Sequence, residues 1–208
     1  VKFERDGHDV IESVLGQGKG AILISAHLGN WELAAYCLGA FRANGRRIPV
    51  NAVMFKGESE KVEKQLKRAS GEQPFQVISS NDALQASIEC MNALKRGEVV
   101  ALHGDRTLGA GGVEVPFLGS VATFPVGPPV LAAQPGAPVV LTFANRLGTR
   151  HYQLMARGPF HYKFRDRRNR EADLKQWAGD YARLLEGLLE KYPLQWHNFY
   201  KFWDKPGA

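Results

Sequence analysis

Hydrophobic residues along this chain fall into two kinds of segment. Short continuous apolar runs bounded by glycine or polar residues are typical of buried strands, whereas apolar residues at three- and four-residue spacing predict helices. On this basis we predict strands at 21–26, 48–55, 75–79 and 97–105, the last running into a loop. We predict helices at 8–15, 30–44, 58–70 and 82–96.

The order of these segments predicts the fold class. Strand and helix alternate through the first half, which favours an αβ sandwich with a largely parallel central sheet and helices on both faces. The second half adds a strand at 112–119, a short helix near 126–134, a strand at 137–144 and a long helix at 171–191. Residues 150–165 alternate between apolar and polar, which predicts a half-exposed antiparallel edge strand.

Two predicted helices carry apolar stripes that should face the core. In 82–96 the stripe is formed by Leu84, Ile88, Met91 and Leu94. In 171–191 it is formed by Leu174, Trp177, Tyr181, Leu184, Leu185 and Leu188. The segment 192–203 is rich in aromatic residues, which either pack against the sheet or lie at a membrane interface.

The composition is that of a globular protein. The chain has 208 residues, 44% hydrophobic and 23% charged, which suits a single domain over 1–208. Cys37 and Cys90 fall in apolar, helix-like contexts and are interpreted as small buried hydrophobes. The net charge of +6 favours acidic partners, such as anionic lipid surfaces, phosphorylated cofactors, acidic carrier proteins or nucleic acid.

No apolar stretch reaches the roughly 18 uninterrupted residues that a membrane-spanning helix needs. The longest, "FPVGPPVLAAQPGAPVVLTFA", is broken repeatedly by Pro and Gly. No signal peptide is visible. The chain begins at Val1 rather than Met, which leaves open a leading segment, an N-terminal membrane anchor included.

One histidine stands where the hydrophobic period changes. In "SAHLGNWELAAY" (25–36), His27 follows a buried strand and Glu32 falls in the first turn of the next helix. Within one helix, a five-residue step would separate the two side chains by about 140°. Gly29 can turn the chain, and Asn30 is a suitable helix N-cap. The Glu32 carboxylate would then reach one ring nitrogen of His27 and leave the other facing the crevice at the strand ends.

Such a pair has a chemical use. A neutral imidazole can take a proton near pH 7, and a carboxylate on its far side fixes the tautomer and stabilises the imidazolium. The pair would activate the hydroxyl of a substrate without a nucleophile from the protein. The alternative is that His27 and Glu32 are ordinary structural residues, and the spacing alone leaves this open.

Four sequence blocks together resemble a known family. "SAHLGNWE" resembles the His-x4-Asp/Glu block of the lysophospholipid acyltransferase superfamily, specifically its branch of bacterial lipid A biosynthesis (late) acyltransferases. "LKRGEVVALHGDR" (94–106), "VEVPFLGSVATFPVGPPVLA" (113–132) and "YPLQW" (192–196) agree with that branch in order and spacing. The likeness covers residues 17–203, nearly the whole chain.

The resemblance implies a membrane-associated O-acyltransferase. It would take a fatty acyl chain from an acyl carrier protein or coenzyme A thioester and transfer it to a hydroxyl of a glycolipid or lipid precursor, at the cytoplasmic face of the bacterial inner membrane. It implies no metal and no protein-bound cofactor. By position, His27 would be the general base and Glu32 its partner. Asp105 would belong to the second acidic block, and Thr123 would line the acyl-binding region.

Two departures from the family indicate a divergent branch and an acceptor other than lipid A. The lipid A enzymes carry an Arg after the second strand–helix region, and "SSNDALQ" (79–85) has none. Arg106, where the family usually has Gln, is a candidate to supply that charge. The C-terminal "HNFYKFW" also replaces a Trp-x-His-Arg-Arg-like segment. Backbone amides at the Gly29 turn and the Arg106 side chain are both candidate donors to the oxyanion.

Two alternatives from other functional classes remain. His103 and Asp105, with His151 or His161 downstream, follow the ligand order of non-haem iron oxygenases, although those enzymes have an all-β fold. The basic run 163–170 is either a solvated face or a dock for anionic lipid or an acidic carrier protein. A non-catalytic lipid- or nucleic-acid-binding module is therefore the third hypothesis.

Overall fold

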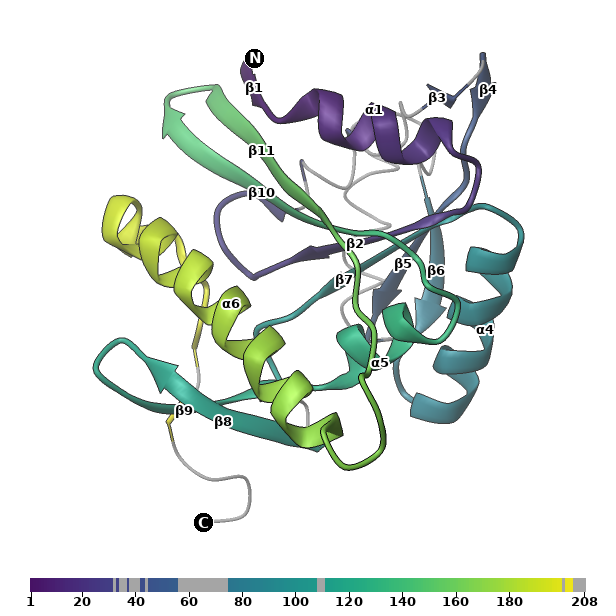
Figure 1. Cartoon of the computed structure of the whole chain (residues 1–208). Helices are drawn as coiled ribbons and strands as arrows, with labels where there is room; N and C mark the ends of the chain where they lie inside the picture. The colour runs from purple at the N-terminus through teal and green to yellow at the C-terminus, as the bar shows by residue number, and fades with distance from the viewer. Residues whose placement is uncertain are drawn as a thin grey trace.

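The computed structural model describes residues 1–31, 33, 37, 42–43, 45–55, 75–107, 111–199 and 201–203. They form a mostly parallel sheet with helices on both faces, so the predicted α/β class is confirmed (Figure 1). The predicted helix 58–70 and most of 30–44 lie outside the described residues. In the part of the chain that is described, no helix combines the length and the apolar character that crossing a membrane requires.

Seven strands form the central sheet, in the order β1-β11-β10-β2-β7-β5-β6. They are β1 (Lys2–Asp6), β2 (Ala21–Ser25), β5 (Val50–Met54), β6 (Gln76–Ser79), β7 (Val99–His103), β10 (Val139–Gly148) and β11 (His151–Phe160). Neighbours are parallel except β10 and β11, which are antiparallel. Two small sheets pair β3 (Arg42–Ala43) with β4 (Arg46–Arg47) and β8 (Gly112–Phe117) with β9 (Ser120–Pro125).

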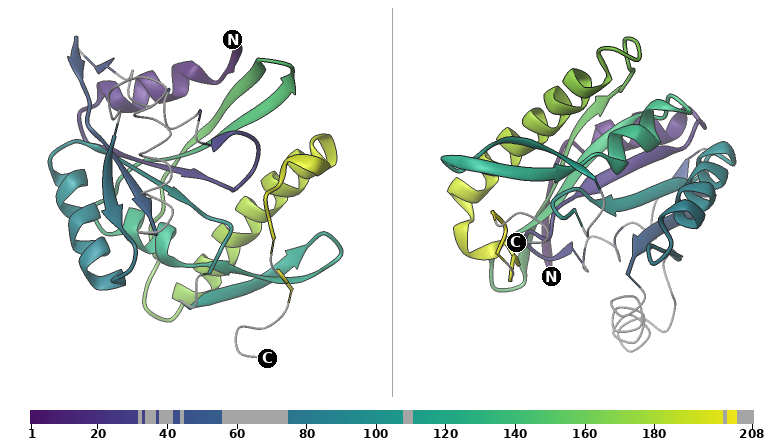
Figure 2. Two further views of the ribbon diagram at one scale, coloured as in Figure 1. Left: turned by 180° about the vertical axis from the view of Figure 1, so that it is seen from behind. Right: turned by 90° about the horizontal axis from the view of Figure 1, so that it is seen from below.

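The helices divide between the two faces of the sheet (Figure 2). One face is covered by α1 (His8–Gly16) and the other by α4 (Ala83–Lys95), α5 (Gly127–Ala133) and α6 (Arg170–Lys191), which is followed by the 3₁₀ turn η1 (Pro193–Gln195). Strand β2 serves both layers because alternate side chains point to opposite faces: Ile22 and Ile24 pack with α4 and α6, and Leu23 packs with α1.

Sequence-local signals explain the ends of two helices. The Asp82 carboxylate accepts the backbone N–H groups of Leu84 and Gln85, which satisfies two donors at the start of α4. Helix α6 has Glu171 and Asp173 in its first turn and Lys191 in its last, the arrangement that the helix dipole favours. Its predicted apolar stripe is buried against the core, apart from Leu184, which is partly buried there.

The predicted buried face of α4 is wrong. Leu84 is 73% exposed and Ile88 is 49% exposed, whereas the sheet is contacted by Ala86, Cys90 and Ala93 together with Leu94. Small side chains let the helix axis approach the sheet closely, so they occupy the face that the larger side chains were expected to fill. Cys90 is a buried free thiol, as predicted, and burial raises its pKa to about 11.

Strand β11 pairs antiparallel with β10 as predicted, but it is not an edge strand. The N-terminal strand β1, which the hydrophobic pattern did not predict, runs parallel along it from Lys2↔His151 to Asp6↔Met155. The first four residues of β1 are exposed and Asp6 is half-buried. The strand therefore has no apolar run from which it could be predicted. Its place in the sheet is decided by main-chain pairing.

Candidate active site

Two parallel neighbouring strands bring the candidate residues to one edge of the sheet. Strands β2 and β7 pair in register, with Ser25 opposite His103, so both end at the same carboxyl edge. His27 lies two residues beyond β2, and Asp105 lies two residues beyond β7. This edge is where ligand sites of open α/β sheets are built, as the sequence predicted for His27.

The Asp105 carboxylate holds His27 from two sides. Nδ1 of His27 lies 2.9 Å from Oδ1 of Asp105, and the His27 backbone N–H donates to Oδ2 at 3.0 Å. The indole Nε1–H of Trp196 also donates to Oδ2, at 3.1 Å. Since Asp105 is only 1% exposed, this network fixes both the orientation of the imidazole and the nitrogen that carries its proton.

Asp105 is ionised in this setting. Its burial acts to raise its pKa, but the hydrogen bond and positive charge of His27, with help from Trp196, hold the pKa at about 2. A buried carboxylate that remains charged near neutral pH is suited to stabilise an imidazolium on its neighbour.

Two glycines let the backbone come together at this edge. Gly29 has a φ of 70°, and a Cβ there would lie 2.1 Å from the backbone oxygen of Ala144. The Gly29 N–H donates to the Gln195 carbonyl at 2.9 Å, which ties the turn after His27 to the C-terminal segment. A Cβ on Gly104 would lie 2.8 Å from the Ile24 side chain, so only glycine fits between His103 and Asp105.

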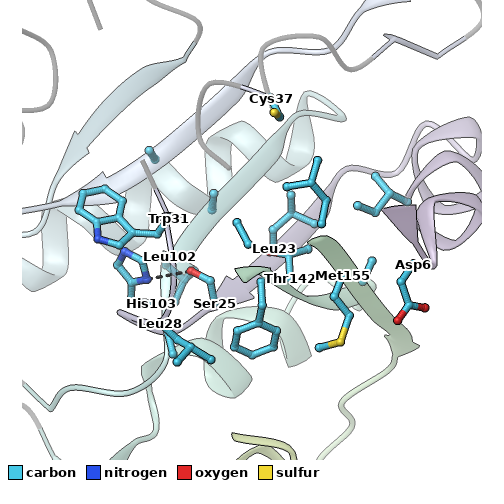
Figure 3. Close-up of a pocket in the computed structure, with 18 of the residues that line it drawn as sticks. Asp6, Leu23, Ser25, Leu28, Trp31, Cys37, Leu102, His103, Thr142 and Met155 are labelled. Carbon is cyan, nitrogen blue, oxygen red and sulfur yellow. Dashed lines mark hydrogen bonds between the residues drawn. The ribbon is translucent and has the colours of Figure 1, made fainter. Parts of the chain in front are cut away.

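His103 is a second imidazole at the site, and sequence reasoning missed its position. Its ring centroid lies 4.1 Å from that of His27 and 5.2 Å from that of Trp31. Its Nδ1 is hydrogen-bonded to the Ser25 hydroxyl at 2.8 Å (Figure 3). In the sequence, the "HGD" triplet indicates only a metal-binding pattern, because nothing local places His103 beside His27.

Two cavities meet at these residues. The first, of about 480 Å³, has a mainly apolar lining that includes Leu23, Leu28, Phe143 and Met155. Figure 3 shows His103 and Trp31 at one end of this cavity and Asp6 at the opposite end. The second, of about 380 Å³, is lined by His27 and Arg106 among others. His103 lines both.

The structure bears differently on each of the remaining predicted site residues. Asn30 caps the next helix as predicted, with Oδ1 accepting the Leu33 N–H at 2.9 Å. Arg106 lines the second cavity and donates to the His197 carbonyl at 2.7 Å. Thr123 lies on β9 opposite Glu114 and borders neither cavity. Glu32 lies outside the described residues, so its contact with His27 stays a prediction.

The same residues are the candidates for holding a metal ion. Within the described ranges, His27, His103 and Asp105 are the one group of three such side chains, with ligand atoms within 4.8 Å of one another. Hydrogen bonds already engage Nδ1 of both imidazoles and both oxygens of Asp105. His151, expected as a distal ligand, instead pairs with Glu4 at 2.8 Å. The geometry therefore favours a hydrogen-bonded acid–base pair.

A histidine held by a buried carboxylate at the strand ends of an α/β sheet can take the proton of a hydroxyl group. A sequence model of the bacterial lipid A biosynthesis acyltransferases matches residues 1–205, and the chain belongs to this family.

Two mycobacterial relatives share a name. The chain is 31% identical over 144 residues to the phosphatidylinositol mannoside acyltransferase of Mycobacterium tuberculosis (strain ATCC 25618 / H37Rv), which covers 65% of this chain and 42% of that protein. It is 25% identical over 214 residues to the protein of the same name from Mycolicibacterium smegmatis, and this match covers 94% of this chain and 60% of that protein. The chain thus spans about half the length of these relatives.

Proposed function

We propose that this chain transfers a fatty acyl group from a thioester of acyl carrier protein or coenzyme A to a hydroxyl of an anionic glycolipid. The observation that carries the proposal is the 2.9 Å contact between Nδ1 of His27 and the buried Asp105 carboxylate. The name of the mycobacterial relatives makes a mannosylated phosphatidylinositol the first acceptor to test. The net charge of +6 suits such an anionic lipid.

His27 is the general base of the proposed reaction. With its Nδ1–H donated to Asp105, the opposite nitrogen, Nε2, carries the lone pair. Nε2 removes the proton of the acceptor hydroxyl as the oxygen attacks the thioester carbonyl carbon. The tetrahedral intermediate then collapses, the carbon–sulfur bond breaks, and the imidazolium returns its proton to the leaving thiolate. The reaction needs neither a metal nor a protein-bound cofactor.

The apolar cavity is the proposed place of the acyl chain. Its mainly apolar lining and its volume of about 480 Å³ suit an extended hydrocarbon. Its far end holds Asp6, which is paired with Arg157 at 2.6 Å. A buried alkyl tail would gain nothing from contact with this ion pair, so the pair is suited to limit chain length.

Exposed apolar side chains near the C-terminus support contact with a membrane. Leu194 is 95% exposed and Phe199 is 87% exposed, and Trp203 is also exposed. The basic run 163–170 is partly engaged by the protein itself, since Arg165 pairs with Asp173 and Arg170 lies over the Phe164 ring at 4.4 Å. We therefore assign membrane contact to the apolar side chains rather than to this run.

Turnover of acyl carrier protein and coenzyme A thioesters, measured against a panel of glycolipid acceptors, tests the proposal. His27→Ala should lower turnover by several orders of magnitude because it removes the base, with the fold retained. His161→Ala, at an exposed histidine beyond β11, is the matched control and should stay close to wild type. Turnover by His27→Ala at the wild-type rate would refute the mechanism.

The same assay separates the alternatives. An iron oxygenase would lose activity when a chelator is added and recover it with Fe²⁺, whereas the proposed reaction is insensitive to both. A lipid-binding module would bind acceptor vesicles and release no free thiol from any thioester.

A further inference from the structure

His103 lies between the proposed base and the proposed acyl cavity, and the mechanism above leaves it without a role. Its ring is 4.1 Å from that of His27, centroid to centroid, and it borders both cavities. Among the described residues, the charged or titratable groups that act on it are His27, Asp105 and Arg106. It is therefore within reach of any group that reacts at His27.

The neighbours of His103 keep it neutral. Burial lowers its pKa to about 3, and the positive charges of His27 and Arg106 act in the same direction against the opposing effect of Asp105. Because a second positive charge beside an imidazolium at His27 is unfavourable, His103 carries one ring proton throughout the reaction.

Ser25 decides which nitrogen carries that proton. Its hydroxyl is 2.8 Å from Nδ1 of His103, and within the described ranges this is the one hydrogen bond that the hydroxyl makes. A hydroxyl that donates to Nδ1 leaves the proton on Nε2. Within the same ranges, Nε2 has no hydrogen-bond partner and is not among the fully buried polar atoms, so its N–H borders open cavity.

We propose that the Nε2–H of His103 donates a hydrogen bond to the thioester carbonyl oxygen and holds the oxyanion that forms on it. Ser25 is the positioning residue that fixes the required tautomer. This role rests on the proposed acyl transfer and names its oxyanion donor. The two rings lie 4.1 Å apart, centroid to centroid, and both line the second cavity. A carbonyl group at the edge that the rings share could therefore be attacked beside one imidazole while its oxygen faces the other.

The proton and electron balance is simple. The acceptor oxygen forms a bond to the carbonyl carbon, its proton passes to Nε2 of His27, and the carbonyl electron pair moves onto oxygen. His103 donates a hydrogen bond at this stage and transfers no proton. When the carbon–sulfur bond breaks, the oxygen regains its double bond and His27 protonates the thiolate. A neutral imidazole serves as the electrophile because it needs no charge of its own.

Two other roles suit the contacts less well. Ser25 as a nucleophile would need His103 as its base, and an imidazole with a pKa of about 3 is a weak base near neutral pH. Arg106 as the sole oxyanion donor lines only the second cavity, whereas His103 also lines the proposed acyl cavity.

The test compares His103→Phe, which keeps a ring without the donor, with His103→Gln, whose amide N–H can stand near the position of Nε2. We expect His103→Phe to lower kcat by about 10²- to 10³-fold with little change in KM, and His103→Gln to recover part of the loss. Ser25→Ala should lower kcat several-fold. His161→Phe and Ser79→Ala, at exposed positions whose own side chains line neither cavity, are the matched controls.

Two readouts exclude a merely structural effect. The pH profile of kcat should keep its shape between about pH 5 and 9, because His103 does not titrate there and His27 remains the base. A thioether analogue of the donor, which has no carbonyl oxygen, should bind the wild type and His103→Phe equally well.

Several results would overturn this role. They are a kcat of His103→Phe above a tenth of wild type, no recovery in His103→Gln, or loss of thioether binding. If His103→Phe does not fold, an unchanged kcat in Ser25→Ala counts against the role equally. A wild type that turns over no thioester refutes the proposed function itself, which is a separate result.

Discussion

Nδ1 of His27 and Oδ1 of Asp105 are 78 positions apart in the sequence and 2.9 Å apart in space. The contact arises because β2 and β7 are parallel neighbours in register, each followed by a short loop. The second carboxylate oxygen accepts from the His27 backbone and from Trp196, so Asp105 is held in place by the residue it orients and by the C-terminal segment.

Asp105→Asn should abolish most of the activity. The amide cannot stabilise an imidazolium and can turn its N–H toward Nδ1, which favours the wrong tautomer. We expect kcat to fall on the order of 10³- to 10⁴-fold, measured as thiol release with circular dichroism to confirm folding. Glu32→Gln is the matched comparison, because Glu32 is the acid that the sequence motif predicts. A larger loss in Glu32→Gln than in Asp105→Asn would make Glu32 the partner of His27.

Trp196→Phe should weaken the support of Asp105. The substitution keeps an aromatic ring against Phe117 and Phe202 but removes the indole N–H that donates to Oδ2. Loss of a hydrogen bond to a charged group should lower the free energy of unfolding by about 1.5–3 kcal/mol, and kcat should fall less than in Asp105→Asn. Urea denaturation measures the first and thiol release the second. Trp203→Phe, at a partly exposed ring, controls for the change of ring size in the stability measurement.

The order of the elements followed from local patterns, because each depends on residues close in sequence. The apolar run of β2 and the spacing in α6 each predict an element that the structure contains. Strand β1 could not be found in this way, since its side chains are mostly exposed and its pairing with β11 joins residues about 150 positions apart. The spacing of large side chains predicts the wrong face of α4, because the buried face consists mainly of small residues that allow a close approach to the sheet.

The site divides in the same way. His27 was found because a strand end and a glycine turn are visible locally, and Asn30 caps the following helix for the same reason. The contacts of Asp105, Trp196 and His103 depend on which strands become neighbours, which the sequence of one chain does not state. Spacing along the chain predicts Glu32 as the acid partner, and this stays a prediction, whereas the contact of Asp105 with His27 depends on the pairing of β2 with β7.

The stability of the protein should depend on pH through Asp105. Its pKa in the folded state is about 2, below the value of about 3.9 for an unfolded chain. Ionised Asp105 therefore contributes stability above about pH 4, roughly 2.6 kcal/mol, and this contribution is lost as the pH falls toward 2. The difference in unfolding free energy between wild type and Asp105→Asn should shrink over that range. Asp180→Asn, in an exposed pair with Arg183, is the control, and its unfolding free energy should differ little from wild type at every pH. A difference between wild type and Asp105→Asn that does not change with pH would contradict the lowered pKa of Asp105.

Gly29→Ala should damage both the fold and the site. The backbone at Gly29 has a φ of 70°, which costs about 1–2 kcal/mol for an L-residue. The added Cβ would also meet the backbone oxygen of Ala144 at 2.1 Å, and this atom cannot move without disturbing β10. The separate effect of the clash is measured against Gly136→Ala, where φ is 65° and a Cβ would meet nothing within 4 Å. We expect Gly29→Ala to lower the free energy of unfolding by well over the roughly 1 kcal/mol expected for Gly136→Ala, as measured by urea denaturation. Gly29→Ala should also lower kcat, because the turn that follows His27 must shift. Equal losses in the two variants would show that the close approach of Gly29 to β10 does not constrain the loop that carries His27.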